Sequence, residues 1–101
     1  MTYDLGFGIT RDFINTIDLA LRRGDYDTAV ILGKGLAYLL EAERGSYWGY
    51  YSYALGGRLM PIHTVGLRVL EHMLPIVKEK IERDLEDDLM DIERVLKGVS
   101  S

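Results

Sequence analysis

The sequence predicts an all-α protein, a four-helix bundle whose long C-terminal helix kinks near Pro75. Apolar residues recur at helical spacing along most of the chain. Residues 20–44 contain a helix end, a very short turn and a second, nearly all-apolar helix, which together predict an antiparallel hairpin. With 101 residues, 48% of them hydrophobic, the chain fits a single globular domain, residues 1–101, with a modest core.

The first helix is expected at residues 10–23. Residues 1–9 are predicted to form an irregular lead-in to it. Thr10 is a suitable N-cap, and Asp12 follows in the first turn, where a negative charge suits the helix dipole. Gly24 fits the left-handed position that commonly ends a helix.

The second helix is expected at residues 25–44, with Asp25 as its cap. Its apolar side chains cover nearly the whole circumference, which is typical of a central helix that is buried on several sides. Gly33 and Ala37 lie four residues apart and would let another helix approach closely. The short turn makes this helix the antiparallel neighbour of the first.

An aromatic segment at residues 46–56 is predicted to form a short third helix that ends at two glycines. The aromatic residues would also suit a strand, but no partner strand is visible in the sequence. Tyr47, Trp48 and Tyr51 could stack on bases, yet the segment contains no Lys or Arg to contact phosphates. We therefore expect these aromatic residues in the core or in an oligomer interface.

The last helix is expected at residues 60–98, with Pro61 near its start and a kink or break at Pro75. A straight helix of this length would measure about 55 Å. That length exceeds the diameter of a compact domain of this size, which is roughly 33 Å. The helix must therefore either fold back into the core or project and pack on another chain.

The apolar residues of this helix repeat at alternating spacings of four and three, as in a coiled coil: Leu85, Leu89, Ile92, Leu96 and Val99. We favour the projecting arrangement, in which Leu85, Leu89, Ile92 and Leu96 form an interface with a second copy of the chain. The alternative is an internal core helix.

Composition excludes several classes of function. The chain has no Cys and only two His residues, so no disulfide or thiolate site is possible, and no metal or cofactor is expected. The net charge of −4 and the acidic C-terminal helix disfavour nonspecific binding to nucleic acid. No apolar run is long enough to span a membrane and no leader segment is visible, so we expect a cytoplasmic protein. The absence of Gln and the single Asn suit a thermophilic source, or reflect sampling in a short chain.

One pair of residues suggests chemistry. Arg58 and His63 are separated by four residues. A guanidinium can hold a phosphate and stabilise developing charge, and an imidazole can move a proton near neutral pH. The alternative is that the Arg lies on the surface and the His makes ordinary hydrogen bonds near a helix start.

The spacing of this pair resembles the R-x4-6-H motif of HEPN domains. The hairpin turn Arg23-Gly24-Asp25-Tyr26 and the following Asp27-Thr28-Ala29 are also similar to that family. The resemblance implies a small helical bundle and, in many members, a metal-independent ribonuclease. It also implies that Arg58 and His63 would act as catalytic residues in a site formed across a dimer.

The sequence thus leads to a main expectation and two alternatives. We expect a protein-interaction or oligomerisation module, either a homodimer or another homo-oligomer, with a possible further protein partner and no membrane association. The first alternative is a HEPN-like ribonuclease of toxin or defence type, the only case in which RNA is a partner. The second is a helical subunit that works only within a larger assembly.

Overall fold

A computed structural model of the chain describes residues 2–42, 52–55 and 58–100. The described part contains four α-helices, one short hairpin of two strands and one 3₁₀ turn, in this order: α1 (Thr2–Arg22), α2 (Tyr26–Ala42), β1 (Ser52–Leu55), β2 (Arg58–Pro61), α3 (Ile62–Val77), the 3₁₀ turn η2 (Arg83–Leu85) and α4 (Glu86–Ser100). The Cα radius of gyration is 13.0 Å, as expected for a compact chain of this length. The all-α, four-helix fold class is confirmed.

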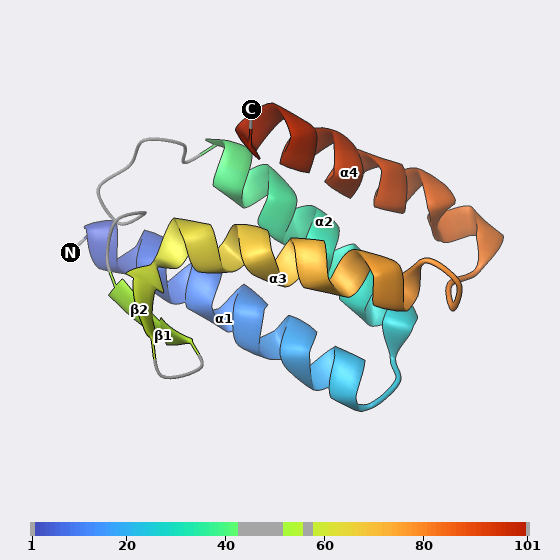
Figure 1. Cartoon of the computed structure of the whole chain (residues 1–101), viewed down its shortest axis with the longest axis horizontal. Coiled ribbons are helices and arrows are strands. Elements are labelled where there is room, and N and C mark those ends of the chain that lie inside the picture. Colours follow the sequence, from blue (N-terminus) through green and yellow to red (C-terminus); the bar gives the residue numbers. More distant parts are fainter. Residues whose placement is uncertain (1, 43–51, 56–57, 101) are drawn as a thin grey trace.

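Figure 1 shows how the helices are arranged. The helices α2 and α3 form the centre, and α1 and α4 lie on opposite sides of this pair. Consecutive helices run antiparallel, so α2 and α4 run in the same direction. The helix α2 contacts each of the other three helices, as its all-round apolar sequence predicted. No helix among the described residues is long and apolar enough to cross a membrane.

The turn between α1 and α2 forms as predicted. Gly24 has a φ of +73°, which L side chains rarely adopt. The N–H of Asp25 donates to the carbonyl of Ala20 at 2.9 Å, and the N–H of Gly24 donates to Leu21 at 3.2 Å. This is the Schellman pattern of helix ends. The Asp25 carboxylate then accepts a hydrogen bond from the N–H of Thr28 at 3.4 Å and caps α2.

The predicted start of the first helix is wrong. The helix α1 begins at Thr2, so residues 2–9 are helical and Thr10 is not an N-cap. Thr10 is instead fully buried in the middle of the helix. A glycine inside a helix costs only about 1 kcal/mol, which packing elsewhere in the helix can offset. The glycines of the N-terminal segment were therefore a weak signal against a helix.

The predicted helix at residues 46–56 is wrong for its described part. Residues 52–55 form β1, which pairs antiparallel with β2, with Tyr53 and Met60 as partners in the backbone register. Residues 46–51, which include Tyr47, Trp48 and Tyr51, lie outside the described residues. The missed signal was the pair Gly56-Gly57 between two short apolar runs, which is as typical of a hairpin as of a helix end.

The predicted last helix is two helices. The helix α3 includes Pro75 and continues to Val77, and α4 returns antiparallel to it (Figure 1). The break therefore follows Pro75 and does not lie at it. Acidic residues occupy the first turn of α4: Glu86, Asp87 and Asp88. Negative charge in the first turn stabilises the start of a helix. A new helix can therefore begin at Glu86 although no proline lies between α3 and α4.

The buried apolar residues form one cluster, to which all four helices contribute. Gly33 lies where α3 and α4 both meet α2. A Cβ atom at this position would lie 2.9 Å from the Met73 sulfur and 3.2 Å from Cδ1 of Ile92. The predicted close approach of another helix at Gly33 is thus confirmed, and it involves two helices.

Candidate functional site

The predicted interface residues of the last helix belong to the core of the same chain. Ile92 is fully buried, Leu89 and Leu96 are 5% and 7% exposed, and Leu85 packs against the same cluster. Because α4 folds back, α2 and α3 already cover this apolar stripe. The projecting arrangement is therefore corrected in favour of the alternative, an internal core helix. These residues cannot meet a second chain unless α4 leaves its own bundle.

The residues of the suggested catalytic pair lie where β2 meets α3. Arg58 is the first residue of β2. His63 is the second residue of α3 and is half-buried. The strand leads directly into the helix, so the backbone of both residues lies at one end of α3 (Figure 1). Among the described residues, no group of three His, Asp or Glu side chains is placed to hold a metal ion.

A candidate surface that the sequence did not reveal runs along α2. Four residues at helical spacing share the side of α2 that faces away from the core, and we call them the outer stripe of α2: Ile31, Gly35, Tyr38 and Ala42. Ile31 is 57% exposed and Tyr38 is 40% exposed. The stripe therefore alternates large apolar side chains with small ones at helical spacing.

A shallow depression lies on the α1 side of this stripe. It is lined by two charged or polar residues and three apolar ones: Ile9, Asp12, Phe13, Thr16 and Leu32. The ring of Phe13 lies next to Gly35, because a Cβ there would approach Cε1 of Phe13 to 2.9 Å. The depression and the outer stripe of α2 are therefore continuous, and Ile9 extends the apolar area with an exposed side chain.

An ion-pair network borders the stripe on its α4 side. The Nζ atom of Lys34 lies 2.7 Å from Oδ1 of Asp88 and 3.4 Å from Oδ2 of Asp91. Arg94 contacts Asp91 at 3.3 Å and lies 3.5 Å from the Tyr38 hydroxyl. The contacts of Lys34 with Asp88 and Asp91, and of Tyr38 with Arg94, join α2 to α4. The hydrogen bond to Asp88 is the main cause that raises the pKa of Lys34 above its usual value of 10.5.

Replacing Lys34 with methionine should destabilise the protein at neutral pH by an amount that shrinks at high pH. The folded state raises the pKa of Lys34, so its stabilising contribution is complete below the pKa of the unfolded chain. The contribution is lost as the pH rises through the higher pKa of the folded state. The measurement is the difference in urea midpoint between wild type and Lys34→Met, taken at pH 7 and above pH 11. A difference that does not depend on pH would contradict the assignment.

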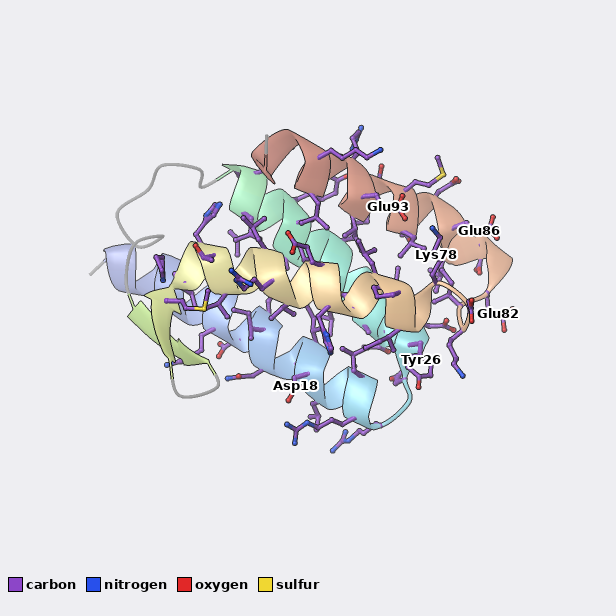
Figure 2. The ribbon with its side chains drawn as sticks, viewed as in Figure 1. Asp18, Tyr26, Lys78, Glu82, Glu86 and Glu93 are labelled. Atoms are coloured by element: carbon purple, nitrogen blue, oxygen red, sulfur yellow. The ribbon has the colours of Figure 1, made fainter. Side chains whose placement is uncertain are left out.

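A groove separates the outer sides of α3 and α4. Leu74, Pro75 and Leu96 provide its apolar surface, and three charged residues surround it: Lys78, Glu93 and Lys97. The groove has a volume of about 420 Å³. Figure 2 shows Lys78 and Glu93 facing one another from α3 and α4, and their charged atoms are 3.9 Å apart.

The chain matches no family model, no curated protein and no solved structure. The outer stripe of α2 and the groove between α3 and α4 are therefore interpreted from their own chemistry.

Proposed function

We propose that this chain is a small helical interaction and oligomerisation module that binds an amphipathic helix of another protein along the outer stripe of α2. The observation that carries the proposal is the exposure of Ile31 and Tyr38 on one side of a helix whose other sides are covered. Ile9 and the depression beside Phe13 and Leu32 widen this apolar area.

The pattern of side chains favours a helix as the binding partner. Helices pack by setting the ridges of one surface into the grooves of another. The large residues Ile31 and Tyr38 form ridges, and the Phe13 ring of α1 packs beside Gly35 between them, so the surface there is also apolar. Burying the exposed half of an isoleucine side chain contributes roughly 1–2 kcal/mol, so a few such contacts give measurable affinity. Contiguous exposed apolar area of this kind is typical of protein-binding sites.

The test is a selection of helical peptides from a displayed library against the purified protein. We expect the selected peptides to be amphipathic and to lose at least tenfold in affinity for Ile31→Glu. The matched control is Met90→Glu, since Met90 is at least as exposed but lies on α4. Peptides that bind wild type, Ile31→Glu and Met90→Glu equally would contradict the proposal, provided that circular dichroism shows all three proteins folded.

The HEPN-like ribonuclease is kept as a second proposal because Arg58 and His63 lie at the same end of α3. Support would come from RNA cleavage that survives a chelator and disappears in both Arg58→Ala and His63→Ala. No cleavage, or equal cleavage by all three proteins, would remove this enzymatic function.

A further inference from the structure

The helix α4 has an outer side that the core of the bundle leaves exposed, although Arg94 on this side also contacts Asp91 and the Tyr38 hydroxyl. Five exposed residues lie on it, and we call them the outer face of α4: Glu86, Asp87, Met90, Arg94 and Lys97. Met90 is 63% exposed, the highest value among the large apolar side chains of the described residues. This face is opposite the buried residues Leu89, Ile92 and Leu96, so it remains available in the folded chain.

The charges on this face follow an order along the helix. Glu86 and Asp87 lie in the first turn, Met90 lies in the middle, and Arg94 and Lys97 lie toward the C-terminal end. Two parallel copies of such a face would place like charges together. Two antiparallel copies place acidic residues opposite basic ones, and a two-fold axis produces this orientation. The outer face of α4 is therefore complementary to itself.

The groove between α3 and α4 borders this face. Lys97 belongs to both, and Glu93 is on the turn of α4 that follows Met90. An antiparallel second helix whose two-fold axis passes near the level of Ile92 would bring its Asp87 opposite Lys97. The same register brings its Met90 beside the mouth of the groove, between Glu93 and Lys97. The groove surface there is apolar, formed by Leu74, Pro75 and Leu96.

We propose that two copies of this chain pair through antiparallel α4 helices, each inserting Met90 into the α3–α4 groove of the other. This inference rests on the proposed oligomerisation function and names its surface and partner. The unbranched, flexible methionine side chain adapts to irregular apolar gaps, so it suits an open groove. The charged residues around it set the antiparallel orientation.

The dimer should be weak and sensitive to salt. The contact runs along a helix of 15 residues, about 22 Å in length. Such a contact is smaller than the standard interface of about 1,600 Å² of total buried surface. We expect a dissociation constant in the micromolar range or above, rising with ionic strength because the charged pairs remain close to solvent.

Charge reversal and mixing test this pairing. The first variant carries Glu86→Lys and Asp87→Lys, and the second carries Arg94→Glu and Lys97→Glu. Each variant alone would place like charges together at both ends of the interface, so its dimerisation should weaken at least tenfold in sedimentation equilibrium. In an equimolar mixture, every charged contact of a mixed dimer is again between opposite charges. Dimerisation of the mixture should therefore return to near the wild-type level.

A control with the same kinds of substitution is available on α1, where Asp18→Arg and Arg22→Asp reverse an exposed ion pair on the helix that lies on the opposite side of the bundle from α4. It should leave dimerisation unchanged, and circular dichroism should show all variants folded. Met90→Glu should also weaken the dimer at least tenfold. A wild-type protein that stays monomeric at millimolar concentration, or a mixture that does not regain dimerisation, overturns the inference. The peptide-binding experiment tests the proposed function on a different surface, the outer stripe of α2. Failure of the dimer and failure of helix binding can therefore be told apart.

Discussion

Replacing Ile92 with alanine is expected to lower the free energy of unfolding by about 2–5 kcal/mol, the usual cost of removing a buried isoleucine side chain beyond Cβ. Ile92 is fully buried, and its Cδ1 atom would lie 3.2 Å from a Cβ at Gly33. The substitution leaves a cavity between α4 and α2 because a rigid glycine backbone on one side cannot fill it. In a chain of this size the melting temperature should fall by at least about 8 °C.

Urea denaturation followed by circular dichroism measures this loss, and Met90→Ala is the matched control on the same helix. Because Met90 is mostly exposed in the single chain, its truncation should change the free energy of unfolding by less than about 0.5 kcal/mol when both proteins are measured at concentrations where they are monomeric. The opposite result would be equally informative. Ile92→Ala could instead leave the free energy of unfolding unchanged and reduce association between chains. In that case α4 would pack on another chain, and the core described above would be incorrect.

Replacing Gly33 with valine is expected to have the second large effect, a loss of about 1–3 kcal/mol from overpacking. A Cβ alone would lie 2.9 Å from the Met73 sulfur, and this flexible side chain can move away. Valine adds two methyl groups at the point where Met73 and Ile92 both approach α2. One of the two neighbouring helices must then shift, because Ile92 belongs to α4 and Met73 to α3.

Gly8→Val is the control for the Gly33 experiment, since a Cβ at Gly8 meets nothing within 4 Å. It tests the change from glycine to valine in a helix without crowding, and it should leave stability unchanged or slightly higher. Thermal melts of wild type, Gly33→Ala, Gly33→Val and Gly8→Val would order the effects. Equal stability of Gly33→Val and wild type would show that α3 and α4 do not approach α2 closely at this position.

Features that depend on a few neighbouring residues were predictable. The turn at Gly24 and the cap at Asp25 form because their hydrogen bonds join residues no more than five apart. The central position of α2 was also predictable, because a helix that is apolar all round must be covered on several sides. Its uncovered side was not predictable, since Ile31 and Tyr38 look the same in the sequence as their buried neighbours.

The hairpin and the course of the last helix were decided by distant parts of the chain. An isolated pair of strands is marginal in water, and both strands contact α3, which supplies the support that a sequence pattern does not show. The apolar spacing of Leu89, Ile92 and Leu96 requires an apolar cover but does not say which chain provides it. Because the chain folds back after Val77, α2 and α3 of the same molecule provide that cover.

The sequence by itself thus determined the all-α class, the first hairpin of helices and the central position of α2. These properties follow from local hydrogen bonding and from the helical period of apolar residues. Only the tertiary structure decided which apolar residues remain exposed, because that depends on where the neighbouring helices end. It therefore also decided the candidate surfaces, the outer stripe of α2 and the outer face of α4 with Met90.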